Sequence, residues 1–356
     1  MAPSMEVQLT DGTATVTATA DGNSVLVTTA VTMNAPVPPD PVPPDPSPDP
    51  DDGSANAPTG AAQFPGLLDQ FAHKPAWKVA GVDYRVGSNY APHTDAANIR
   101  MVGVSVNAGS KYISIDADNI ELEGVDFTNW YLIVRGKNAH VHDCLFRLGS
   151  SAAWYAAQVY GDDFTIEYCE VDGTQALNQA SGMIAVYGQN PTARYVWFHD
   201  FPQHAIEMVQ DETKTTTLDY RFCLLSNGGK QQGAHYNGLQ WNKGHVTTAV
   251  VAYNTVMQQK QVAGGECFQF YGNFSPWSCD DGQLHHCTLY SEGGTASDPA
   301  ISYGLNLTGG VGKCHDNMFG LKSAYGPIYP VSTNSLWVFE NNIDMATGKV
   351  VTAPVR

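Results

Sequence analysis

The sequence predicts an all-β solenoid of stacked parallel strands, and two series of repeated short segments predict it. In the first series, each segment alternates apolar and polar residues with the two-residue period of a half-buried strand. The segments are GMIAVYG (182–188), HAIEMVQ (204–210), NGLQWNK (237–243), ECFQFYG (266–272) and YGLNLTG (303–309). If they stack in parallel, their third and fifth positions fill a core. Their fourth positions then form an outward polar ladder of Ala185, Glu207, Gln240, Gln269 and Asn306.

The second series places a Cys, Asn or His between apolar residues, near an expected turn. Its members are IEYCEV (166–171), VWFHDF (196–201), YRFCLL (220–225), VAYNTV (251–256), LHHCTL (284–289), CHDNMF (314–319) and FENNID (339–344). The marked residues recur at an irregular period of roughly 20 to 35 residues, which indicates a solenoid.

This pattern resembles the right-handed parallel β-helix of the pectate-lyase-like superfamily over roughly residues 80–350. The resemblance implies coils of three strands, about ten of them, with Asn or small residues stacked at an inside turn. It implies a fold more than a function, because one fold supports many functions.

The composition limits the kinds of partner and the kinds of site that this protein can have. The net charge of −17 opposes binding to nucleic acid, although a local basic cluster would still admit an anionic polysaccharide. The seven Cys include no CxxC pair, so we expect small buried residues in a stack, with neither a disulfide framework nor the ligand spacing of a zinc site. No apolar run approaches the length of a membrane span, and the N-terminus lacks the pattern of a signal peptide.

Three regions follow in order. Residues 1–35 are expected to form a small antiparallel β module for attachment or assembly, with strands within 5–33 and turns at Asp11-Gly12 and Asp21-Gly22. Residues 36–62 form a Pro/Asp-rich linker, with nine prolines between 36 and 50. Residues 63–356 form the β-helix with an N-terminal cap. In this region 64–71 is a short helical turn that covers the open end, and 77–87 is the first strand pair.

The coils with the longest periods carry loops that would border a groove, and these loops concentrate ionisable and aromatic residues. The candidate catalytic residues are Glu207, Asp211, His235, Lys243, Glu266 and Tyr271. The candidate substrate-binding residues are His204, Gln240, Asn242, His245, Gln269, Trp277 and Asn306.

The segment AHYNGLQ (234–240) resembles a His-x-Asp-Gly-Ile/Leu-Gln segment of carbohydrate-active β-helix proteins. His235 and Gln240 match that segment, whereas Asn237 stands where the acid would be. The resemblance therefore supports carbohydrate binding here but not a carboxylate at this position.

Two reactions remain open. A β-eliminating lyase would use a base, an acid and a cation that neutralises a uronate, with His235, Lys243 and Tyr271 available. A glycoside hydrolase would use two carboxylates from among Glu207, Asp211 and Glu266. We expect no cofactor and predict no metal site. A weaker alternative is a calcium ion at Asp280–Asp281 or at Asp116 and Asp118.

The sequence thus predicts a protein that binds and degrades a polysaccharide. A tailspike-like depolymerase on a virion, as a homotrimer or attached through residues 5–33, fits the absence of a signal peptide. The alternatives are an extracellular bacterial lyase, hydrolase or epimerase, and a non-enzymatic adhesin or structural β-helix.

Overall fold

The protein forms two compact units, Met1–Pro50 and Asp51–Arg356, in a computed structural model. The structure describes residues 4–10, 13–20, 23–30, 52–149, 155–176, 182–210, 213–229, 236–241, 244–258, 265–270, 277–291, 301–331 and 336–355.

The first unit is a three-stranded antiparallel sheet of β1 (Ser4–Thr10), β2 (Thr13–Ala20) and β3 (Asn23–Ala30). β2 pairs with β1 on one side and with β3 on the other, as the alternation of Thr with Val and Ala predicts. The antiparallel module is therefore confirmed. The two predicted Asp-Gly turns and residues 31–50 of the linker lie outside the described residues.

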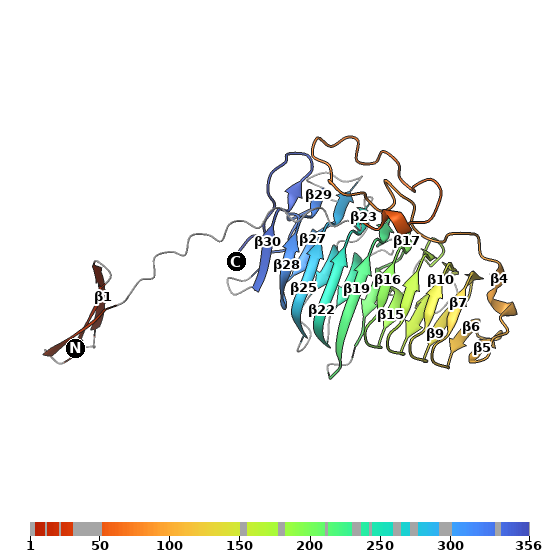
Figure 1. Ribbon diagram of the computed structural model, residues 1–356, viewed down its shortest axis with the longest axis horizontal. Coiled ribbons are helices and arrows are strands. Elements are labelled where there is room, and N and C mark those ends of the chain that lie inside the picture. The colour runs from red at the N-terminus through yellow and green to blue at the C-terminus, as the bar shows by residue number, and fades with distance from the viewer. Residues whose placement is uncertain are drawn as a thin grey trace. The chain divides into compact units, whose positions relative to one another are not determined.

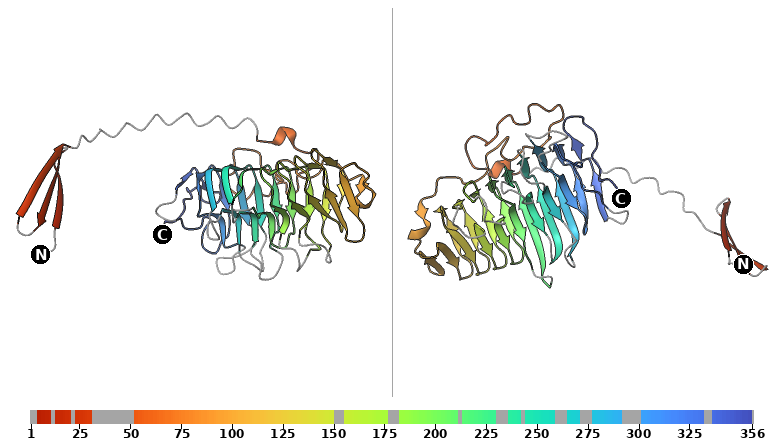
Figure 2. Two further views of the ribbon diagram at one scale, coloured as in Figure 1. Left: turned by 90° about the horizontal axis from the view of Figure 1, so that it is seen from below. Right: turned by 180° about the vertical axis from the view of Figure 1, so that it is seen from behind.

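The second unit is a right-handed parallel β-helix, in which each coil contributes one strand to each of three long sheets (Figures 1 and 2). Sheet I is β7 (Glu121–Glu123), β10 (His140–His142), β13 (Thr165–Glu167), β16 (Thr192–Arg194), β19 (Thr215–Arg221), β22 (Gly244–Ala252), β25 (Trp277–His285), β28 (Val311–His315) and β30 (Leu336–Glu340). Sheet II is β4 (Thr94–Asp95), β8 (Val125–Asp126), β11 (Leu145–Arg147), β14 (Glu170–Asp172), β17 (Trp197–His199), β20 (Leu224–Ser226), β23 (Thr255–Gln258), β26 (Thr288–Ser291), β29 (Met318–Gly320) and β31 (Ile343–Asp344). Sheet III is β5 (Val104–Asn107), β6 (Tyr112–Ile115), β9 (Tyr131–Val134), β12 (Ala157–Val159), β15 (Gly182–Val186), β18 (His204–Met208), β21 (Tyr236–Trp241), β24 (Gly265–Phe270) and β27 (Tyr303–Leu307). Two short 3-10 helices, η1 (Ser54–Asn56) and η2 (Ala96–Asn98), complete the described elements.

Sheet III carries the first series of segments in the predicted register. Ile184, Ile206, Leu239, Phe268 and Leu305 are successive Cα partners across β15, β18, β21, β24 and β27. All five are buried in one hydrophobic core inside the coils. The apolar alternation therefore fixed both the parallel pairing and its register.

Each coil passes from sheet I to sheet II through a two-residue corner. The first corner residue has a positive φ angle, and the column it forms is Gly124, Asp143, Tyr168, Tyr195, Phe222, Tyr253, His286, Asp316 and Asn341. The second residue is buried, and its column is Val125, Cys144, Cys169, Val196, Cys223, Asn254, Cys287, Asn317 and Asn342. All seven Cys are unpaired and buried, and four of them lie in this column, so the expectation of small residues in a stack is confirmed for these four.

One coil was placed out of register. The segment 196–201 was aligned with His199 at the corner, but β14 pairs with β17 so that Glu170 opposes Trp197. Val196 therefore follows Cys169 in the buried column, while His199 opposes Asp172 on sheet II. Val196 fills the position as a small apolar residue, which the pattern of Cys, Asn or His does not include.

Residues 52–93 form a strap along the corner column, drawn in orange in Figure 1. Its Gly53 carbonyl accepts a hydrogen bond from Tyr195 Oη at 3.0 Å, and Trp77 packs edge-on against His286. The strand pair predicted over 77–87 is wrong, because this stretch makes only an isolated bridge between Ala80 and Tyr84.

The two ends of the strap correct further predictions. Residues 52–62 belong to the strap, so the linker predicted over 36–62 ends earlier. The 64–71 turn was expected to cover the open N-terminal end, but Phe71 contacts Tyr290 of β26, far along the solenoid. Among the described residues, no helix is long and apolar enough to cross a membrane.

Candidate functional site

The fourth positions of the aligned segments form a continuous column in sheet III. Ala185 is the Cα partner of Glu207, which in turn opposes Gln240 on β21. Glu207 and Gln240 are partly exposed, whereas Ala185 and Asn306 are buried. The ladder exists in register, but of its described polar side chains only Glu207 and Gln240 reach solvent.

Glu207 is held by a tyrosine from an earlier coil. Tyr155 Oη donates to Glu207 Oε2 at 3.0 Å. The ring of Tyr155 lies over Gly182, where a Cβ atom would stand 3.3 Å from it. Burial raises the pKa of the Glu207 carboxyl above its ordinary value, and the hydrogen bond from Tyr155 offsets this only in part.

Three polar side chains accompany Glu207 on β18 and β21. His204 and Asn237 are Cα partners, 7% and 2% exposed, and Asn237 Nδ2 lies 3.4 Å from His204 Nδ1. Asn237 Nδ2 also donates to Gln240 Oε1 at 3.2 Å. The side chain at the position of the resembled acid therefore acts as an amide that links His204 to Gln240.

Two stacked tyrosines stand beside the same strands. Tyr160 and Tyr187 follow β12 and β15, and their rings are parallel within 8° with centroids 4.7 Å apart. Burial raises the pKa of Tyr187, and the charge of Glu207 adds to this, so the tyrosine lies within electrostatic reach of Glu207. Tyr160 is 44% exposed and offers an aromatic face to solvent.

The sequence reasoning missed Tyr155, Tyr160, Tyr187 and Gly182. A signal for two of them was present, because a strand ending in Val-Tyr-Gly occurs at 159–161 and again at 186–188. Tyr155 had no such signal, since it contacts Glu207 across 52 positions of sequence.

The structure places some other candidates apart from this cluster. His245 lies on sheet I, where its Nε2 atom is 2.8 Å from Asp280 Oδ2. The backbones of Glu266 and Gln269 oppose Asn237 and Gln240 on β24, and Trp277 begins β25. The side chains of Glu266, Gln269 and Trp277 lie outside the described part, as do residues Asp211, His235, Asn242, Lys243 and Tyr271 entirely.

The weak calcium candidates are engaged by other groups. Asp116 Oδ1 accepts from Arg135 Nη1 at 3.0 Å and from Ser114 Oγ at 2.8 Å. Asp280 pairs with His245, as above. Two other groups within the described residues have the donor atoms for a metal ion: Glu121, His140 and His142 on sheet I, and Glu170, Asp172 and His199 on sheet II.

The sheet II group behaves as an ion network. Burial lowers the pKa of His199, but hydrogen bonds to Asp200 and Glu170 and the charge of Asp172 outweigh this and raise it to about 9. Arg147 Nε donates to Asp172 Oδ2 at 2.8 Å. Two cationic side chains thus already neutralise these carboxylates.

Comparisons with known proteins returned no relative: no family model, no curated protein and no solved structure matches this chain.

Proposed function

We propose that the chain binds a polysaccharide along the outward face of sheet III and cleaves it by hydrolysis, with Glu207 as the general acid. One observation carries the proposal: a half-buried carboxyl with a raised pKa stands beside a stacked pair of tyrosines, of which Tyr160 is exposed. A glycosidase acid must hold its proton near the working pH, and burial is the usual way to achieve this.

The cluster supplies the other parts of a sugar site. The Tyr160–Tyr187 pair offers a flat apolar face for a sugar ring, and His204, Asn237 and Gln240 offer polar groups for hydroxyls. Sites of this kind combine apolar surface with a few placed polar groups.

We assign the second carboxylate to Glu266. Its backbone lies two strands from that of His204, or roughly 9.6 Å at the usual strand spacing, and three positions before Gln269, which stands at the level of Glu207. Inverting glycosidases place their two carboxyls about 6.5–9.5 Å apart, which is the separation that this assignment requires. Hydrolysis is preferred to elimination because a carboxyl with a raised pKa is the acid that glycoside hydrolysis needs.

A panel of acidic and neutral polysaccharides tests this function. The wild-type protein should release reducing ends without the absorbance of unsaturated uronates. Glu207→Gln should lower the rate by at least ~100-fold, since general acid catalysis contributes at least this much. Glu340→Gln, an exposed carboxylate of sheet I, serves as the matched control and should leave the rate unchanged.

The other outcomes are distinct. Absorbance together with reducing ends would identify a lyase and overturn the hydrolase. Binding that weakens in Tyr160→Ala, with no product from any substrate, would leave a receptor-binding protein on the same surface. The absence of both binding and cleavage would contradict a carbohydrate site on sheet III.

A further inference from the structure

We propose that Glu121, His140 and His142 bind a divalent transition-metal ion, such as Zn²⁺, on the outward face of sheet I. His140 and His142 are two residues apart on β10, so both side chains lie on one face. Glu121 on β7 is the Cα partner of His140. Imidazole and carboxylate groups are the donors that zinc takes in proteins.

The donor atoms are spaced as the site requires. His142 Nε2 lies 3.1 Å from Glu121 Oε1, and the donors of the three residues lie within 4.8 Å of one another. Zinc bonds of about 2.0–2.1 Å in tetrahedral geometry set donors roughly 3.3 Å apart. Glu167 on β13 lies close to the group, its Oε2 atom 3.3 Å from His140 Nε2.

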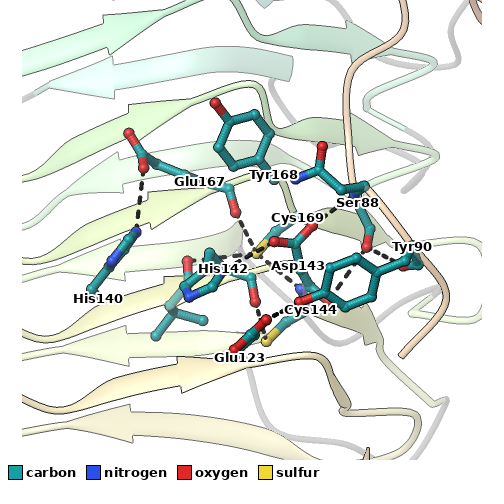
Figure 3. Close-up of polar contacts among 12 residues, drawn as sticks. Ser88, Tyr90, Glu123, His140, His142, Asp143, Cys144, Glu167, Tyr168 and Cys169 are labelled. Carbon is teal, nitrogen blue, oxygen red and sulfur yellow. Dashed lines mark hydrogen bonds and ion pairs between the residues drawn. The ribbon is translucent and has the colours of Figure 1, made fainter. Parts of the chain in front are cut away.

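A second carboxylate, that of Asp143, contacts the other ring nitrogen of His142 and so orients the ring (Figure 3). Asp143 Oδ2 lies 3.0 Å from His142 Nδ1, and Asp143 Oδ1 accepts from the Asn89 main-chain N–H at 2.7 Å. With a proton held on Nδ1 by Asp143, His142 can bind the ion through Nε2, the nitrogen that lies on the side of Glu121. This carboxylate–histidine arrangement is the outer shell that metal-binding histidines commonly have.

His140 gives an independent indication. Its Nε2 atom is buried and makes no hydrogen bond among the described residues, although Glu167 approaches it. An unsatisfied buried polar atom is costly, and an ion bound by His140 together with His142 and Glu121 would satisfy it. Arg194 Nη1 lies 3.9 Å from Glu167 Oε1.

The ion would join β7 and β10, which belong to successive coils. Glu121 is 69% exposed, so water can reach the ion and complete its coordination. We therefore assign it the role of a clamp that stabilises the N-terminal coils. An ion that binds only the folded chain raises the melting temperature as its concentration rises.

Titration of the metal-free full chain with Co²⁺ and Zn²⁺ tests the site. We expect one equivalent to bind, with visible Co²⁺ absorption of a four- or five-coordinate site and a higher melting temperature. His140→Gln, His142→Gln and Glu121→Gln should each weaken binding by at least ~10-fold, and Asp143→Asn by ~10- to 100-fold. His245→Gln, which removes another carboxylate-paired histidine of sheet I, should leave binding unchanged.

Circular dichroism of the metal-free variants separates lost ligands from lost folding, and exposed Glu121→Gln should keep the fold. Absence of saturable binding by the wild-type protein would overturn the proposal. Equal affinity in the His140→Gln/His142→Gln double variant would also overturn it, because the ion would then bind elsewhere. Neither result depends on the activity proposed for Glu207, which lies on another sheet.

Discussion

The raised pKa of Glu207 depends on residues from other coils. On an open strand surface its carboxyl would be fully hydrated, but the Tyr155 ring reaches over Gly182 and removes part of its water. The alternation of β18 identifies Glu207 as outward-facing, so the sequence alone could name it. The raised pKa could not be predicted, because Tyr155 comes from a loop before β12 and contacts it only in the folded solenoid.

This environment predicts a pH-dependent cost in stability. The pKa of Glu207 in the folded state is raised above the ordinary 4.5. Its protonated carboxyl therefore adds to the free energy of unfolding below pH 4.5, and this contribution is lost as the pH rises through the folded pKa. Glu207→Gln keeps an acceptor for Tyr155 and removes the buried charge. Thermal unfolding should show Glu207→Gln more stable than wild type near pH 7, with the difference vanishing near pH 4. A variant that is less stable at neutral pH would contradict this account.

At the scale of the element, the buried corner column stabilises the stack through its asparagines. Asn317 Oδ1 accepts from the main-chain N–H of Cys287 at 2.9 Å, and Asn317 Nδ2 donates to the Leu284 carbonyl at 3.0 Å. Asn254 and Asn342 repeat the arrangement on their own coils. Each side chain thus satisfies main-chain groups that the corner removes from sheet pairing.

Asn317→Ala should therefore destabilise the β-helix by about 2–4 kcal/mol, since it leaves two buried main-chain groups unpaired. Denaturant unfolding measures this change directly. Asn98→Ala, an exposed position of η2, is the control and should stay within about 0.5 kcal/mol of wild type. A similar small change at Asn317 would show that water replaces its hydrogen bonds.

The same elements show where sequence patterns mislead. The alternation in 77–87 is typical of a strand. Here these residues belong to the strap, whose apolar side chains, including Val79 and Val82, pack against the solenoid. The spacing of the Cys residues gives no indication of the His-x-His pair of β10. Its partner carboxylates come from β7 and β13, which only the stacked register brings together.

At the scale of the whole molecule, the repeat predicted the solenoid and the register of sheet III, and the resemblance to a parallel β-helix implied its three sheets. Stacking makes each coil depend on its neighbours, so a local pattern repeated along the chain is enough to specify the fold. The loops between coils obey no such repeat, and most candidate catalytic residues were placed on them. The homotrimer, the virion location and attachment through residues 5–33 stay predictions.

The pH dependence of polysaccharide cleavage tests the central claim most directly. If Glu207 is the general acid, the rate should fall as pH rises through a pKa above the ordinary 4.5, because the reaction needs the protonated carboxyl. Glu207→Gln should remove both this limb and most of the activity, while Tyr155→Phe should keep the limb and move it upward, since the lost hydrogen bond had lowered the pKa. An unchanged alkaline limb in active Glu207→Gln would contradict the account.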